Sequence, residues 1–240
     1  MVQIGNFFFK YRNFLFIFLY LALFIPSTPV FGEAAFGPRH YQYPLIIGLV
    51  ITVVGQLIRG ATISLAYIVR GGKDKKVYAN TLVTDGIFAH CRNPLYVGNI
   101  LMLVGVGVLV NSLLYLVVFI PIFLFIYQAI VLAEENFLRN KFGSDFDAYT
   151  KRVHRWLINP VGLGKTISGM HFSWKRWLIR EYNTQVVWML CIAVILIFKY
   201  DHWQWDTNAR NTWFIIAVVI LACYYGTIRY LKKSGKWTNV

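Results

Sequence analysis

The sequence predicts an all-α, polytopic membrane helical bundle of about six transmembrane helices. Three observations indicate this class. Of 240 residues, 58% are hydrophobic, and only 14% are charged, whereas a soluble domain carries about 25% charged residues. Long apolar runs also recur along the chain, and a helix needs about 20 apolar residues to cross the hydrocarbon core. We therefore expect a bundle in the bilayer with a helical extension on the cytoplasmic side.

Six apolar runs are candidates for spanning helices. They cover residues 14–31, 44–69, 96–110, 113–133, 186–200 and 212–228. Two of them, 96–110 and 186–200, are short and need their flanking residues to reach the length of a span. The first run is long for a secretory signal, and Pro26 and Pro29 make a poor cleavage site, so we expect a retained helix.

The net charge of +14 follows the positive-inside pattern of membrane proteins. Twenty of the 24 Lys and Arg residues lie before the first run, at 70–92, at 139–180 or after residue 228. These are alternate segments, so both termini are predicted to be cytoplasmic, in a bacterial inner membrane or the endoplasmic reticulum. The basic residues then serve topology and the anionic head groups of the lipid bilayer, and we predict no nucleic-acid partner.

Cysteine and histidine give no metal-binding pattern. The three cysteines, Cys91, Cys191 and Cys223, are far apart and odd in number, and the five histidines are scattered. Neither a disulfide framework nor a zinc site is indicated. We predict no metal site.

The chain divides into three segments. Residues 1–81 hold the first two spans and most of a polar connector at 70–84. Residues 82–160 hold a helical hairpin with the candidate cofactor-binding core. Residues 161–240 hold an amphipathic helix at 172–182, expected at the head-group level, and the last two spans.

The hairpin brings two polar clusters to one side of the membrane. Asn111 and Ser112 form its external turn, so the start of its first helix and the end of its second are both cytoplasmic. Glu134 and Glu135 lie at that end, where the helix dipole disfavours negative charge. One can pair with Arg139. Because neighbouring side chains point about 100° apart, the other could accept hydrogen bonds from an ammonium group or from ribose hydroxyls.

Arg92 precedes the first helix of the hairpin. Asn93 suits the N-cap and Pro94 the first turn. Arg92 can bind a carboxylate or phosphate with two hydrogen bonds. Alternatively, it is one of the basic residues that set the membrane topology, and it contacts lipid phosphates. Tyr96 is a candidate site residue or an interfacial anchor, and Gly98 permits close approach of a ligand or of a neighbouring helix.

Beyond Gly143, which ends the second helix, a short helix is expected. Ser144 and Asp147 resemble a capping box that opens it, and it should run to about Val153.

Arg59 and Gln56 are the strongly polar residues within the second span. A charge inside the membrane is costly unless it is paired or functional. Arg59 could contact a substrate carboxylate or head group, or it could form a buried structural pair with Gln56, a backbone carbonyl or a carboxylate.

Several motifs follow one another in a specific order. They are Thr84-Asp85-Gly86, Arg92-Asn93-Pro94-Leu95-Tyr96-Val97-Gly98, Glu134-Glu135-x-x-Leu138, Phe142-Gly143-x-x-Phe146-x-x-Tyr149 and the segment 153–160. In this order they resemble the integral membrane methyltransferase superfamily, which includes isoprenylcysteine carboxyl methyltransferase and the phospholipid N-methyltransferases. Asn93 replaces the histidine usual in the isoprenylcysteine branch, and His154 stands where the family often has proline. The first departure leaves the methyl acceptor open.

The resemblance implies S-adenosylmethionine as cofactor and a membrane lipid or lipidated substrate as partner. It assigns to cofactor binding the residues Arg92, Asn93, Pro94, Tyr96, Gly98, Glu134 and Glu135. Arg59 and Arg92 are the candidate catalytic residues. The methyl acceptor would be an isoprenylcysteine carboxylate or a phospholipid amine.

Two other functions remain open. Membrane sterol reductases share the outline of this superfamily and use NADPH, although they tend to carry an Asp-Glu pair where this chain has Glu134 and Glu135. A non-catalytic membrane scaffold would bind neither cofactor.

Overall fold

The computed structural model describes residues 1–65, 79–200 and 206–237, and over these residues every regular element is helical. The predicted all-α class is confirmed. Most of the expected connector at 70–84 lies outside the described residues.

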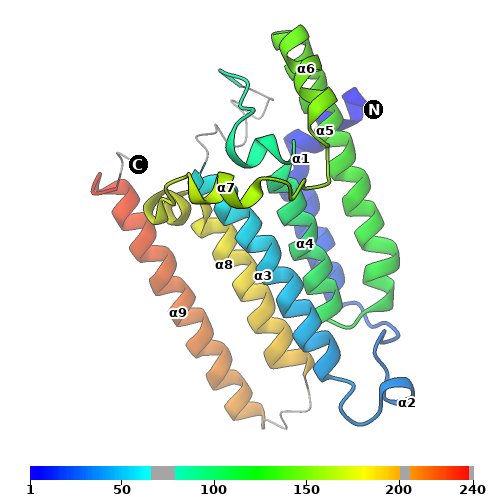
Figure 1. Cartoon of the computed structure of the whole chain (residues 1–240). Helices are drawn as coiled ribbons and strands as arrows, with labels where there is room; N and C mark the ends of the chain where they lie inside the picture. The colour runs from blue at the N-terminus through cyan, green and yellow to red at the C-terminus, as the bar shows by residue number, and fades with distance from the viewer. Residues whose placement is uncertain (66–78, 201–205, 238–240) are drawn as a thin grey trace.

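Six long helices form the bundle (Figure 1). They are α1 (Val2–Leu21, extended by a 3-10 turn at Ala22–Phe24), α3 (Gln42–Leu65), α4 (Pro94–Leu109), α5 (Ile120–Phe142, preceded by a π-helical turn at Tyr115–Phe119), α8 (Trp174–Lys199) and α9 (Thr207–Lys233). Five are long and apolar enough to cross a membrane, while α4, with 16 residues, is apolar but shorter. The expectation of about six spans therefore holds, with α4 as the short member.

Shorter helices cap the two ends of the bundle. They are α2 (Glu33–Phe36), a 3-10 turn at Gly86–Ala89, α6 (Ser144–Arg152) and α7 (Leu163–Ser168). Figure 1 shows α6, α7 and both termini at the same end of the bundle, with α2 at the other. The helical extension that the sequence predicts therefore shares one end with both termini.

The hairpin of α4 and α5 turns at Asn111, which is the non-glycine residue with positive φ (55°) in the described chain. Its side chain also fixes the segment after α1: Oδ1 accepts from the Phe31 backbone N–H at 2.8 Å, and Nδ2 donates to the Phe31 carbonyl at 3.0 Å. Asparagine tolerates this backbone conformation better than most residues. The predicted turn is therefore present, and it also anchors a loop far away in sequence.

Glycines bring α3 and α4 into backbone contact. A Cβ placed on Gly55 of α3 would lie 2.7 Å from the carbonyl oxygen of Gly98, and one on Gly98 would lie 2.5 Å from Cγ of Arg59. Such distances are sterically forbidden, so both positions require glycine. Close helix packing of this kind is typical of membrane bundles. Of the two roles considered for Gly98, the structure therefore shows the close approach of a neighbouring helix.

Two local expectations differ from the structure. The residues expected to form a separate interfacial helix at 172–182 are the beginning of α8, which runs without a break from Trp174 to Lys199 because no helix-breaking residue interrupts it. The capping box is also absent: Ser144 is the first residue of α6 and makes no capping hydrogen bond. Asp147 instead accepts a hydrogen bond from Arg139 at 2.9 Å.

We predict that Gly55→Leu destabilises the bundle by about 1–3 kcal/mol, because the larger side chain separates α3 from α4. The midpoint of thermal unfolding of the detergent-solubilised protein should fall. Gly226→Leu is the matched control, since a Cβ on Gly226 of α9 meets nothing within 4 Å. Equal midpoints for the two variants would contradict this packing.

Candidate active site

A cavity of about 720 Å³ lies inside the bundle. Its walls come from α1, α3, α4, α5, α6 and α8, together with the segment 79–83. This volume is typical of small-molecule sites, which measure about 300–1,000 Å³. Six of the predicted site residues line it, namely Arg59, Arg92, Asn93, Pro94, Tyr96 and Glu134. Gly98 and Glu135 are not among the lining residues, because Gly98 packs on α3 and Glu135 is held by arginines.

Tyr96 and Glu134 join the two helices of the hairpin across the cavity wall. The Tyr96 hydroxyl donates a hydrogen bond to Oε1 of Glu134 at 2.8 Å. Of the two predicted carboxylates, Glu134 is therefore the one that faces the cavity. Its second oxygen has no hydrogen-bond donor among the described residues and is available to a ligand.

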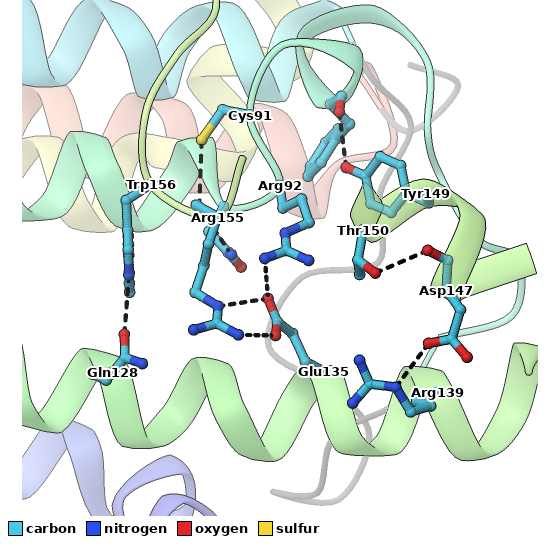
Figure 2. A network of polar contacts seen from close by, with 12 residues as sticks. Cys91, Arg92, Gln128, Glu135, Arg139, Asp147, Tyr149, Thr150, Arg155 and Trp156 are labelled. Atoms are coloured by element: carbon cyan, nitrogen blue, oxygen red, sulfur yellow. Dashed lines mark hydrogen bonds and ion pairs between the residues drawn. The ribbon is translucent and has the colours of Figure 1, made fainter. Parts of the chain in front are cut away.

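Glu135 is buried between two arginines (Figure 2). Its Oε1 lies 3.4 Å from Nη2 of Arg92 and accepts from Nε of Arg155 at 3.0 Å, while its Oε2 accepts from Nη2 of Arg155 at 2.7 Å. The hydrogen bonds to this carboxylate raise the pKa of Arg155 further. The local pairing with Arg139 considered from the sequence is not formed, because Arg139 pairs with Asp147.

Arg155 belongs to an extended segment that packs beside the start of α4. The backbone N–H of Arg92 donates to the His154 carbonyl at 2.9 Å, and Nδ2 of Asn93 donates to the Arg155 carbonyl at 3.2 Å. Asn93 thus occupies the N-cap position without a side-chain cap, since its amide reaches across to this segment. The Cys91 thiol contacts the same Arg155 carbonyl, and burial raises the pKa of Cys91.

The Phe142–Tyr149 motif has a structural explanation. Phe146, Tyr149 and Val153 form a small buried cluster beside Leu82 and Leu138. The Tyr149 hydroxyl donates to the Phe88 carbonyl at 2.8 Å, and burial raises its pKa. This cluster fixes α6 over the end of the cavity that Arg92 lines.

Arg59 is held by a carboxylate on α8. Its Nε and Nη2 donate to the two oxygens of Glu181 at 2.9 and 2.8 Å, and Nη1 donates to the Asn99 side chain and to the Leu95 carbonyl. Glu181 is fully buried. The structural pair considered from the sequence therefore exists, although Arg59 also lines the cavity. Its partner could not be found by sequence reasoning, because it lies 122 residues away.

Exposed residues of α1 and α8 line the cavity, which indicates an opening to the outer surface of the bundle between these two helices. Ile17 of α1 and Val187 of α8 both line it, yet they are 56% and 54% exposed. One turn earlier, Asn13 and Asn183 are likewise exposed and lining. At the opposite end the helices converge, where Lys199 Nζ donates to the Leu23 carbonyl at 3.2 Å. We refer to the opening bounded by Asn13, Ile17, Asn183 and Val187 as the lateral mouth.

Comparison with known proteins gives a family for this architecture. Residues 44–145, which hold Arg59 and all of α4 and α5, match the family model of phospholipid methyltransferase. A probable protein-S-isoprenylcysteine O-methyltransferase of Oryza sativa subsp. indica is 27% identical over 124 residues, covering 50% of this chain and 63% of the relative. These matches support an integral membrane methyltransferase family, so the predicted resemblance is confirmed.

Other relatives carry different names. The cobalt-zinc-cadmium resistance protein CzcN of Cupriavidus metallidurans is 30% identical over 118 residues, covering 49% of this chain. The protein-S-isoprenylcysteine O-methyltransferase of Schizosaccharomyces pombe is 29% identical over 105 residues. The chain spans 52% of the first of these and 43% of the second. No solved structure gives a significant match, and the described ranges contain no cluster of three or more His, Cys, Asp or Glu side chains suited to a metal ion.

We predict that Glu135→Gln lowers the free energy of unfolding by about 3–5 kcal/mol, because two guanidinium groups in a buried site lose their shared carboxylate. Thermal or denaturant unfolding in detergent measures this change. Asp147→Asn is the control: its pair with Arg139 is half-exposed, and such pairs contribute about 1 kcal/mol or less. A Glu135→Gln variant as stable as Asp147→Asn would contradict the importance of the buried pair.

Proposed function

We propose that this protein transfers a methyl group from S-adenosylmethionine to a lipid or lipidated acceptor. One observation carries the proposal. A single cavity joins a charged corner, with Arg92 and Glu134, to an apolar aromatic region with Phe16, Tyr20 and Trp188. A charged cofactor and a lipid acceptor could meet there without leaving the protein, and the match of residues 44–145 to a methyltransferase family model supports this use.

The charged corner suits a cofactor that carries both a carboxylate and an ammonium group. Nε of Arg92 is buried and has no hydrogen-bond partner in the part of the chain that is described, and such an orphaned donor calls for an acceptor. The free oxygen of Glu134 is an acceptor for an ammonium group or hydroxyls. S-adenosylmethionine, when bound, supplies an electrophilic methyl group attached to a positively charged sulfur.

The remaining task of the protein is to orient the reactants and exclude water. Positioning alone can supply about 7–11 kcal/mol of a reaction barrier in favourable cases. Tyr96 fixes the Glu134 carboxylate, and Leu138, Phe88 and Tyr149 wall the charged corner with apolar or aromatic surface. Arg59, whose charge is balanced by Glu181, and its hydrogen-bond partner Asn99 add polar groups to the lining of the cavity.

The lateral mouth gives the acceptor a route from the membrane. Its exposed apolar side chains, Ile17 and Val187, would face lipid chains, so an acceptor could enter sideways while the cofactor enters from the end that carries both termini. By the distribution of basic residues this end is cytoplasmic. The phospholipid methyltransferase match and the isoprenylcysteine relatives name different acceptors, so both a phospholipid amine and an isoprenylcysteine carboxylate fit the proposal.

Titration calorimetry with S-adenosylhomocysteine and, separately, NADPH tests the proposed cofactor. We expect binding of S-adenosylhomocysteine alone, weakened about tenfold or more by Arg92→Ala and by Glu134→Gln, since each loses a charge-assisted contact. Lys10→Gln, an exposed position on α1 outside the cavity, should bind like the original protein. Binding of NADPH alone would instead indicate a reductase. Binding of neither ligand would indicate a scaffold.

Blocking the lateral mouth should separate acceptor entry from cofactor binding. We expect Val187→Trp to raise KM for a lipid acceptor about tenfold or more while the affinity for S-adenosylhomocysteine stays unchanged, because a methylene-rich acceptor loses its passage. Val219→Trp, on the lipid-exposed face of α9, is the matched control. The kinetics of both variants are measured as methyl transfer to extracted lipids from isotopically labelled cofactor. Unchanged kinetics in Val187→Trp would rule out entry of the acceptor through the lateral mouth.

A further inference from the structure

One guanidinium in the cavity wall forms no ion pair with any carboxylate of the described residues. Arg12 of α1 lines the cavity and is half-buried, with its guanidinium carbon 4.6 Å from the centroid of the Phe9 ring. It forms no ion pair or hydrogen bond with any residue that the structure describes. Arg12 lies outside residues 44–145, so the matched family segment does not include it.

The other lining arginines differ from Arg12 in this respect. Arg59 is paired with Glu181, and Arg92 lies 3.4 Å from Glu135. Glu134, the lining carboxylate that interacts electrostatically with Arg12, is hydrogen-bonded by Tyr96 and lies beyond ion-pair distance of Arg12. A partly desolvated cation without a counter-ion is unfavourable unless an anion binds there. The α1 side of the cavity therefore carries a guanidinium that forms no direct ion pair with a described residue.

Polar and apolar residues are arranged in the same order on both helices of the lateral mouth. On α1, Arg12 and Asn13 follow Phe9 and precede the apolar run of lining residues that begins at Phe16. On α8, Asn183 and Thr184 precede Val187 and Trp188. The helices run in the same direction, since both lead to the contact between Leu23 and Lys199. Both polar pairs therefore lie toward the end of the bundle that holds both termini, and we refer to these four residues as the polar collar.

Beyond this collar the lining is apolar and aromatic. Phe16, Ile17 and Tyr20 follow on α1, and Val187 and Trp188 follow on α8. The indole N–H of Trp188 is buried without a partner among the described residues. This sequence of a cationic, amide-rich collar and an aromatic interior matches an amphiphile with an anionic head and apolar chains.

We propose that Arg12, with Asn13, Asn183 and Thr184, binds the phosphate group of a lipid that enters through the lateral mouth. Arginine matches the geometry of phosphate oxygens, and amide and hydroxyl groups can satisfy the remaining acceptors. The inference rests on the proposed function in one respect only, which is that the bound lipid is taken to be the methyl acceptor.

Quenching of tryptophan fluorescence by brominated lipids tests the site without turnover. The probes are phosphatidic acid and diacylglycerol with the same brominated chains, which differ in the phosphate group alone. Comparison with Trp188→Phe isolates the share of the signal that arises inside the cavity. The variants are Arg12→Gln and, as the matched control, Lys10→Gln, which removes the same charge from an exposed position of the same helix.

We expect phosphatidic acid to quench Trp188 at a lower concentration than diacylglycerol does. Arg12→Gln should raise the half-quenching concentration of phosphatidic acid about tenfold, since it removes a charged hydrogen-bond donor. Quenching by diacylglycerol should be unchanged, which also shows that the variant is folded, and Lys10→Gln should match the original protein. Equal effects of Arg12→Gln and Lys10→Gln, or none of either, would overturn the proposal.

Calorimetry with S-adenosylhomocysteine separates the lipid from the cofactor as the source of the anion. Unchanged affinity in Arg12→Gln supports a lipid phosphate. Loss of this affinity with lipid quenching retained would assign Arg12 to the cofactor carboxylate and overturn the inference. Should the original protein bind no S-adenosylhomocysteine but still show the Arg12-dependent preference, the proposed function fails while the phosphate site stands.

Discussion

A buried charge in a membrane protein requires a partner, and this constraint shapes the whole interior. Glu135 ties α5 to the start of α4 and to the segment around Arg155, and so closes the end of the bundle that carries both termini. Glu181 ties α8 to α3 through Arg59. These two carboxylates fix the helices that surround the cavity, and they leave Glu134 as the carboxylate that lines it.

The cavity is assembled from two parts of the chain. The matched segment 44–145 supplies the charged corner with Arg92 and Glu134, whereas α1 and α8 supply the lateral mouth and much of the aromatic interior. Under the proposed function, α1 and α8 are therefore the helices in which to test acceptor specificity.

The local features of the hairpin were predictable because they depend on neighbours in sequence. Apolar length gives the spans, the Asn111 turn brings Tyr96 and Glu134 to one end, and Pro94 begins α4. The predicted capping box is absent, because the Asp147 carboxylate accepts a hydrogen bond from Arg139. The assignments of Gly98 and Glu135 to cofactor binding remain predictions, although both side chains have packing or pairing explanations and neither lines the cavity.

The sequence alone determined the class of fold, the order of the spans and the end at which the charged residues gather, since hydrophobic length and charge asymmetry are local properties. Only the tertiary structure decided which charges neutralise one another. Arg155, Glu181 and Asn99 carry no periodicity that marks them, and their partners lie 20, 122 and 40 residues away. Because pairing in a low-dielectric interior depends on distance in space, it left Arg12 as a cation with no counter-ion among the described residues, at the opening of the cavity.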